Sequence, residues 1–333
     1  GRGRRVGWVD GQRVLDLTAR QPAWDSVYHI FWESRAAGMA IEQYIVERCS
    51  ATELPSIDYG ALLSRRPGDS EGWLLSPLDH PDPAHCHVGG TGLTHLGSTA
   101  SRDAMHKSSD LPKTDSQKMF EMGLQGGKPP SGQRGVAPEC FYKGSGVIVR
   151  AHGDYLDIPS FTDDGGEEPE IVGCYIIGPR GVPYRLGFAI GNEWADHAVE
   201  RVNYLWLAPS KLRTCSIGPE LVTDQAFQDI RGRCRILRAE QVVYDSGELL
   251  TGEQHMSHSL ANLEDHHFKH PQFRVPGDVH LYFFGTMKLS FGQRGPFQDG
   301  DRVEIAFEGM GAPLANPVRK LPKDDRPIVV RKG

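Results

Sequence analysis

The stretch GGEEPEIVGCYII, from Gly165 to Ile177, is the part of the sequence that says most about the fold. Its apolar second half predicts a strand. If the strand begins near Glu168, then Glu168 and Glu170 project from one face, because side chains alternate with period 2. Pro169 has no N–H and suits the start of a strand. Two carboxylates on one face repel unless a cation lies between them. The pattern therefore indicates a cation site, and an acidic turn before a strand is the equally weighted alternative.

A third carboxylate, Glu193, stands where the apolar stretch 186–190 gives way to a predicted helix. A side chain at such a junction is held rigidly and can point into a shared cleft. Glu193 would otherwise only complement the dipole of the helix that follows. Three carboxylates with open positions for water and substrate are typical of Mg²⁺ or Mn²⁺ sites rather than structural zinc sites.

The remaining patterns predict a small N-terminal α/β unit over residues 1–80 and a larger, mainly β unit over 81–333. Asp10-Gly11 between two short apolar runs predicts a hairpin, and residues 36–48 have helical spacing. Residues 98–135 form a long polar, lid-like stretch, in which 115–123 is a candidate helix capped by Asp115. Further strands are predicted at 146–150, 171–177, 184–190, 234–237, 279–284 and 302–307, and helices at 195–207 and 257–268.

Composition excludes several classes of protein. The 333 residues carry a net charge of −6, which gives no general attraction to nucleic acid or anionic lipid. No apolar run has the length needed to span a bilayer, and the basic start lacks the apolar segment of a signal peptide. The six cysteines form no CxxC pair and fit reduced thiols, so we expect a cytoplasmic protein.

Histidines gather at 80–87 and at 266–270, but neither group has a second ligand pair at a recognised zinc spacing. The sequence therefore favours surface or supporting roles for them. His95 differs because it follows a Gly-rich turn, a good place for an exposed reactive group. The same turn lacks the GxxxxGK[ST] pattern, which argues against nucleotide binding.

Ordered motifs over residues 85–320 resemble the fumarylacetoacetate hydrolase superfamily. They are FYK at 141–143, SK at 210–211, GP at 218–219, PGDVHLYFFGT at 276–286, and GDRVEIAFEGMG with NPV between 300 and 318. The resemblance implies an α+β, mainly β fold: a mixed β-sandwich or β-roll core with a small N-terminal α/β domain. It also implies a homodimer and a Mg²⁺ (or Mn²⁺) cofactor.

The resemblance assigns the metal ligands to a Glu-x-Glu pair and a later acidic residue, here Glu168, Glu170 and Glu193. Aligned backward from Ile177, the second Glu would fall at Val172, so we place a two-residue insertion. Glu193 replaces the family's Asp. The implied substrate and catalytic groups are Lys211 as base or as a clamp on the substrate carboxylate, His95 as acid, Gly285 and Thr286 on the substrate carboxylate, and Lys143 as a structural or substrate-binding cation.

The family's hydrolases pair the catalytic His with a Glu three residues later, and here Ser98 stands at that position. Asp103 or Glu121 is a possible substitute partner. The segments EEPEI, GNE and SKLRTCSIGPEL are similar to bacterial dehydratases of 2-keto-3-deoxy sugar acids. The resemblance thus implies dehydration, in the pentonate case to 2,5-dioxopentanoate, in pentose catabolism. Hydrolysis of a C–C bond in a 2,4-dioxo acid is the alternative within the family, and non-catalytic 2-oxo-acid binding is the alternative outside it.

Overall fold

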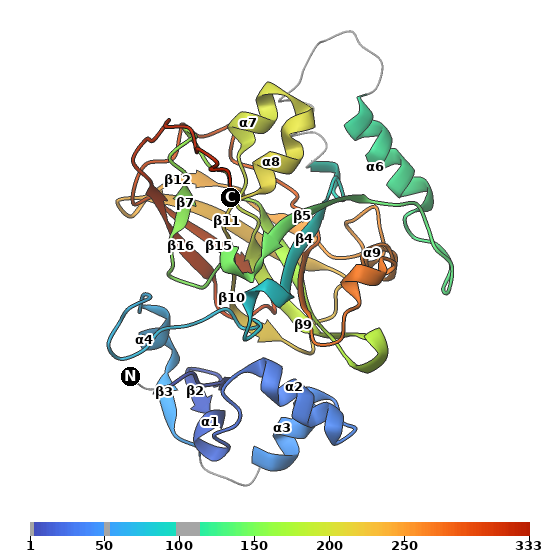
Figure 1. Ribbon diagram of the computed structural model, residues 1–333, viewed down its shortest axis with the longest axis vertical. Helices are drawn as coiled ribbons and strands as arrows, with labels where there is room; N and C mark the ends of the chain where they lie inside the picture. The colour runs from blue at the N-terminus through green and yellow to red at the C-terminus, as the bar shows by residue number, and fades with distance from the viewer. Residues whose placement is uncertain (1–2, 50–53, 98–113) are drawn as a thin grey trace.

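A computed structural model describes residues 3–49, 54–97 and 114–333 of the chain. Within these ranges the first elements form a three-stranded sheet with four short helices beside it (blue in Figure 1). They are β1 Gly7–Asp10, β2 Arg13–Asp16, β3 Ser56–Asp58, α1 Leu17–Arg20, α2 Val27–Ala36, α3 Ile41–Cys49 and α4 Tyr59–Leu63. Gly11 takes φ 61° in the turn between β1 and β2, which confirms the predicted hairpin. The helix predicted over 36–48 begins only at Ile41.

Seven of the described strands form a mixed sheet in the order β5-β4-β14-β8-β9-β10-β6. Their bounds are β4 Cys86–Gly92, β5 Glu139–Ser145, β6 Val149–Arg150, β8 Pro169–Ile177, β9 Pro183–Asn192, β10 Cys215–Val222 and β14 Val279–Phe283. β4 runs parallel to β14, and β8 runs antiparallel to both of its neighbours. The predicted strand at 146–150 is mostly the 3₁₀ turn η2 Gly146–Ile148, and only its last two residues pair as β6.

Another sheet packs against the seven-stranded sheet. Its order among the described strands is β12-β11-β15-β16-β7, with β13 beside β11. The bounds are β7 Leu156–Ile158, β11 Ile230–Arg238, β12 Gln241–Asp245, β13 Leu249–Thr251, β15 Arg302–Phe307 and β16 Leu314–Lys320. Ile171 and Tyr175 of β8 meet Ile236 and Ile305 of this sheet in one apolar core.

The opposite face of β8 is also covered, which explains the unbroken apolar sequence of the strand. Val172, Cys174 and Ile176 lie in a second core together with Phe31 of α2. All nine residues of β8 are buried as a result. The predicted mainly β, α+β fold is confirmed, whereas the boundary near residue 80 stays a prediction.

The remaining helices surround the larger sheets (Figure 1). They are α6 Asp115–Gly126, α7 His197–Val202, α8 Leu207–Lys211, α9 Leu260–Phe268, and the 3₁₀ turns η1 Pro83–His85, η3 Pro179–Gly181, η4 Tyr204–Trp206 and η5 Pro271–Phe273. The helix predicted over 195–207 is wrong in its continuity, since the extended backbone of Asn203 separates α7 from η4 and α8. The cap of α6 is Thr114, in a capping box with Gln117, and not Asp115.

Two further sequence expectations concern thiols and membranes. The six cysteines are all free thiols, five of them buried. No helix in the described ranges combines the length and the apolar character that crossing a bilayer requires.

Candidate active site

Three buried glutamates meet where β8 begins and β9 ends. The antiparallel register pairs Glu170 with Gly191 and Pro169 with Asn192, so the residue after β9 lies beside the residues that open β8. The backbone N–H of Glu193 donates to the Glu168 carbonyl at 3.0 Å, which fixes this junction. One carboxylate oxygen from each of Glu168, Glu170 and Glu193 lies within 4.8 Å of the others. The structure therefore brings together the three carboxylates that the sequence singled out.

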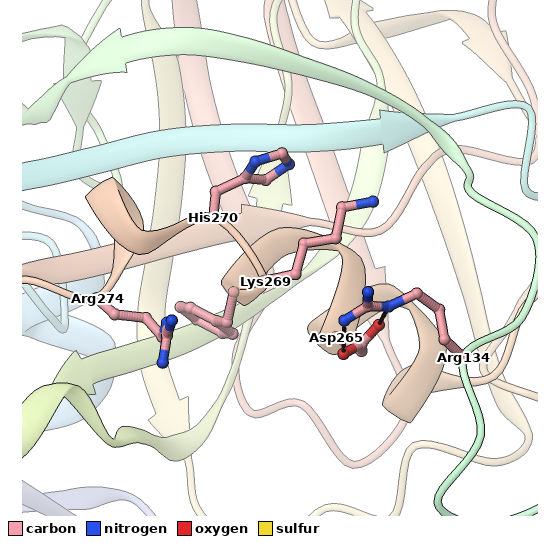
Figure 2. Close-up of a pocket in the computed structure, with 6 residues that line it drawn as sticks. Arg134, Asp265, Lys269, His270 and Arg274 are labelled. Carbon is pink, nitrogen blue, oxygen red and sulfur yellow. Dashed lines mark hydrogen bonds and ion pairs between the residues drawn. The ribbon is translucent and has the colours of Figure 1, made fainter.

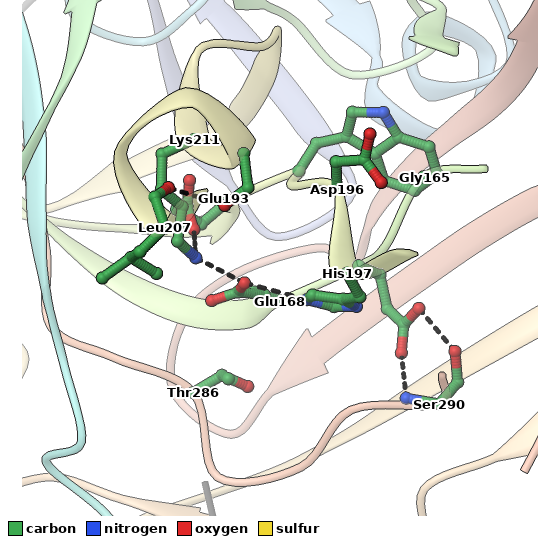
Figure 3. Close-up of polar contacts among 12 residues, drawn as sticks. Gly165, Glu168, Glu193, Asp196, His197, Leu207, Lys211, Thr286 and Ser290 are labelled. Carbon is green, nitrogen blue, oxygen red and sulfur yellow. Dashed lines mark hydrogen bonds and ion pairs between the residues drawn. The ribbon is translucent and has the colours of Figure 1, made fainter. Parts of the chain in front are cut away.

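Two buried lysines neutralise part of this charge. Lys211 Nζ donates to Glu168 Oε1 and to Glu193 Oε2, both at 2.5 Å (Figure 3). Lys143 Nζ donates to Glu193 Oε1 at 2.5 Å, to the Trp194 carbonyl at 2.6 Å and to the Lys211 carbonyl at 2.8 Å. An ammonium has three donors, and those of Lys143 are all used. Of the two roles predicted for Lys143, this geometry fits the structural one and leaves no donor for a substrate.

The pKa values of the three carboxyls are pushed apart. Burial raises the pKa of Glu193. The positive charges of Lys143 and Lys211 oppose this shift, and the resulting pKa is about 7. Burial, with the negative charges of Glu168 and Glu193, raises the pKa of Glu170 well above its ordinary value. Burial alone would do the same to Glu168, but Lys211 and His197 outweigh it and lower its pKa. Glu170 is thus the carboxyl least compensated by cations of the protein.

The cluster fits a hard divalent cation. Three oxygen ligands held at the paired ends of β8 and β9 are a donor set that suits Mg²⁺. The pKa of Glu170 is raised first by burial and then by repulsion from Glu168 and Glu193, and a bound cation would oppose both effects. Glu168, Glu170 and Glu193 are therefore the residues of this chain able to hold such an ion.

The loop after β14 closes one side of the cluster. The backbone N–H of Gly285 donates to Glu170 Oε2 at 2.7 Å. Gly285 has φ 94°, and a Cβ there would lie 2.2 Å from Thr94 Oγ1, so glycine is required. Thr286, drawn below the carboxylates in Figure 3, is buried and donates its hydroxyl to the Lys288 carbonyl at 3.2 Å.

Sequence reasoning missed the residues that anchor the GGEE segment. His197 Nε2 lies 3.0 Å from Glu168 Oε1, at the start of α7. Glu167 accepts from the backbone N–H of Ser290 at 2.7 Å and from its hydroxyl at 2.6 Å (Figure 3). The only signal for His197 was its position four residues after Glu193. Nothing in the sequence linked Glu167 to a serine 123 residues away.

His95 is buried rather than exposed, contrary to our expectation. Its Nδ1 lies 2.9 Å from Thr94 Oγ1 and its Nε2 lies 3.1 Å from Thr251 Oγ1. Burial, with a smaller contribution from His255, lowers its pKa to about 3. His95 is therefore neutral at pH 7. Of its two suggested partners, Asp103 lies outside the described residues, as does Ser98, and Glu121 is half-buried in α6.

Known structures share this architecture. No protein-family model and no curated protein sequence matches the chain. A solved 2-keto-3-deoxy-D-arabinonate dehydratase in its apo form superposes with a TM-score of 0.66 at 19% identity, over 95% of this chain and 94% of that one. The same enzyme complexed with magnesium and 2,5-dioxopentanoate gives 0.65. Maleylpyruvate hydrolase from Sphingobium sp. SYK-6 gives 0.55 at 14% identity, over 96% and 97%.

The chain has the fumarylacetoacetate hydrolase fold. The superposition confirms the predicted fold, and it extends over 95% of this chain. Because the similar structures include a dehydratase and a hydrolase, the shared fold does not select a reaction, which has to be argued from the site.

Within the fumarylacetoacetate hydrolase fold, the surroundings of Lys211 bear on the choice between its two predicted roles. A lysine that serves as a base must be uncharged, and burial favours the uncharged form. Burial does act in that direction, but Glu168 and Glu193 outweigh it and raise the pKa of Lys211 above its ordinary value. The side chain is held as an ammonium, which fits the predicted clamp better than the predicted base.

A separate surface pocket of about 580 Å³ lies at the end of α9 (Figure 2). Its lining is Arg134, Asp265, Phe268, Lys269, His270 and Arg274. Arg134 and Asp265 are paired with each other across it. None of the predicted site residues lines this pocket, so it is distinct from the carboxylate cluster.

Proposed function

We propose that the chain is a Mg²⁺-dependent hydro-lyase that dehydrates a 2-keto-3-deoxy sugar acid, converting 2-keto-3-deoxypentonate to 2,5-dioxopentanoate. The observation that carries the proposal is the convergence of Glu168, Glu170 and Glu193 in one buried cluster with Lys211. The shared fold with a dehydratase that binds magnesium and 2,5-dioxopentanoate supports the substrate class. Six free thiols fit the proposed cytoplasmic setting. We further propose that the chain acts as a homodimer in pentose catabolism, as the family resemblance implies.

The chemistry requires loss of a proton from C3 and of the hydroxyl from C4. A divalent cation, when bound, supplies Lewis acidity that makes the C3 proton of a 2-oxo acid easier to remove. Lys211 keeps its ammonium at the cluster and attracts the substrate carboxylate. Thr286 and its neighbouring backbone would orient that carboxylate from the opposite side, since the Gly285 N–H is already used to hold Glu170.

The proton-transfer roles that we propose differ from those that the resemblance implied. A neutral imidazole accepts a proton, whereas an ammonium bonded to two carboxylates does not. We therefore assign proton acceptance at C3 to His95, whose imidazolium then returns that proton to the C4 hydroxyl so that it leaves as water, and we assign the electrostatic clamp to Lys211. Thr94 and Thr251, which contact the two ring nitrogens of His95, hold its ring in place.

The decisive experiment compares two substrate classes. Purified protein with Mg²⁺ is offered 2-keto-3-deoxypentonates and 2,4-dioxo acids, and kcat/KM is measured for semialdehyde formation and for C–C cleavage. We expect dehydration to be faster by at least about tenfold, because an acid–base contribution is typically on the order of 10². In D₂O, deuterium should enter C3, and also C4 through the tautomerisation that forms the aldehyde. Faster cleavage of the dioxo acid would refute dehydration, and binding without turnover of either class would refute an enzyme.

Substitutions at two residues test the roles assigned to His95 and Lys211. His95→Gln should stop deuterium exchange at C3 and lower kcat while KM changes little. Lys211→Met should mainly raise KM, and Lys211→Arg should restore part of the binding because it keeps the charge. If Lys211→Arg also loses all C3 exchange while His95→Gln keeps it, Lys211 is the base and our assignment is wrong.

A further inference from the structure

The far end of β14 carries a second cluster of ligand-type side chains, away from the carboxylates. β4 and β14 are parallel neighbours, and their register pairs His87 directly with His280. Asp278 comes two residues before His280, and therefore on the same face of the strand. Gly285, which holds Glu170, follows the opposite end of β14. Five residues of strand, or roughly 16 Å, separate His280 from that loop.

The three side chains converge closely enough to share an ion. His87, Asp278 and His280 each offer one ligand atom, and these atoms lie within 4.8 Å of one another. His87 Nε2 is 3.1 Å from Asp278 Oδ2. The rings of His87 and His280 have centroids 4.9 Å apart. Asp278 and His280 are buried, and the His87 side chain is 21% exposed, which leaves a route for an ion from solvent.

The second observation is a buried nitrogen with no partner. His280 is 0% exposed, and its Nε2 has no hydrogen-bond partner among the described residues. A buried polar atom left in this way destabilises the folded state, so native proteins rarely keep one without a reason. A histidine network held only by hydrogen bonds would not leave this atom unused, whereas a metal ion would use it.

The other polar atoms of the cluster are already held by neighbours. His280 Nδ1 lies 3.0 Å from His267 Nε2, His87 Nδ1 lies 3.2 Å from Tyr142 Oη, and Asp278 Oδ1 lies 2.8 Å from His85 Nδ1. Metal-binding histidines in proteins generally bond through the second ring nitrogen in this manner, which fixes the ring and its tautomer. The arrangement leaves His280 Nε2, His87 Nε2 and Asp278 Oδ2 as the ligand atoms.

We propose that His87, Asp278 and His280 form a binding site for a divalent transition metal ion of the Zn²⁺ type, with a fourth position open. Two imidazoles and one carboxylate match the ligand preference of zinc and its neighbours, and imidazole is a poor ligand for Mg²⁺. The single carboxylate gives the site one negative charge to offset the ion. The site is separate from the carboxylate cluster and does not depend on the proposed reaction.

The test uses the full chain and Zn²⁺ as the probe, with excess Mg²⁺ present so that zinc does not compete for carboxylates. Zinc affinity is measured against a chromophoric chelator, and Co²⁺ is used for its absorption spectrum. We expect one zinc per chain. His280→Phe and His87→Asn should each weaken binding by about 100-fold and remove the Co²⁺ spectrum, because each loses one of three ligands. His85→Ala should weaken it by about 10-fold, as expected for a residue that orients a ligand.

Two controls separate this site from others. His255→Asn removes a partly exposed histidine whose Nε2 lies 2.7 Å from Asp229. These two residues belong to no group of three ligand-type side chains among the described residues, so the substitution should leave zinc affinity unchanged. Glu170→Gln should also leave it unchanged, which distinguishes failure of this site from failure of the carboxylate site. If His280→Phe does not fold, His87→Asn decides, since its side chain is partly exposed. A wild-type chain that takes up no zinc, or variants that keep it, would overturn the proposal.

Discussion

Replacing Lys143 by Met tests how the buried charges support one another. The Lys143 side chain is completely buried, and its ammonium bonds Glu193 and two backbone carbonyls. Removing one partner of a buried ion pair costs about 3–5 kcal/mol, because it leaves the other charge uncompensated. Lys211 still contacts Glu193, which favours the lower end, while the two orphaned carbonyls add to the cost. We expect a loss of about 3–5 kcal/mol, a large part of the 5–15 kcal/mol typical of folded proteins.

The measurement is urea unfolding followed by circular dichroism, with the free energy of unfolding obtained by linear extrapolation. Lys118→Met is the matched control, because Lys118 makes an exposed pair with Asp115 and should cost less than about 1 kcal/mol. The double variant Lys143→Met with Glu193→Gln should be more stable than the sum of the single losses predicts, by about 1–3 kcal/mol. A loss below about 1 kcal/mol in Lys143→Met, or additive single losses, would refute the view that Lys143 is the structural counterion of Glu193.

Three further outcomes follow from the site and the core. A chelator should abolish turnover and leave the circular dichroism spectrum unchanged, because the carboxylates lie where β8 begins and β9 ends, in a large core that folds around apolar side chains; unfolding by the chelator would contradict this. Glu170→Gln should weaken Mg²⁺ binding at least about tenfold in titration calorimetry, whereas Val172→Ala, two residues along the same face, should not. Burial lowers the pKa of His258 to about 4, so His258 binds a proton more readily in the unfolded chain. Its contribution to stability is present above pH 6.5 and is lost as the pH falls toward 4, at about 1.4 kcal/mol per unit. Urea midpoints measured between pH 7 and pH 4.5 should therefore fall less steeply for His258→Gln than for the wild type, and equal slopes would argue against it.

The local patterns of the sequence predicted the positions of Glu168 and Glu170, because period-2 alternation depends only on neighbouring residues. The hairpin at Gly11 was predictable for the same reason. The helix over 195–207 was not, since the break at Asn203 is a matter of backbone conformation that apolar spacing does not report.

Long-range pairing explains most of what the sequence did not reveal. Lys143 reaches carbonyls of residues 51 and 68 positions later, so its motif could not show which of two roles it has. His87 and His280 meet only because β4 and β14 are neighbours in the sheet. No spacing rule joins residues so far apart, the histidine group at 80–87 lacked a zinc pattern when considered alone, and His280 belonged to neither histidine group.

The complete burial of β8 has a consequence for how fast its amide hydrogens exchange with solvent. Amide hydrogens exchange through local openings, and strands covered on both faces open with free energies close to that of global unfolding. Glu170 sits within β8, between the neighbouring strands β14 and β9. We therefore expect the amides of β8 to be among the last to exchange with deuterated solvent, long after those of α6, whose residues are largely exposed or half-buried. Transient openings would then expose the amides of α6 while the cation-binding end of β8 keeps its structure.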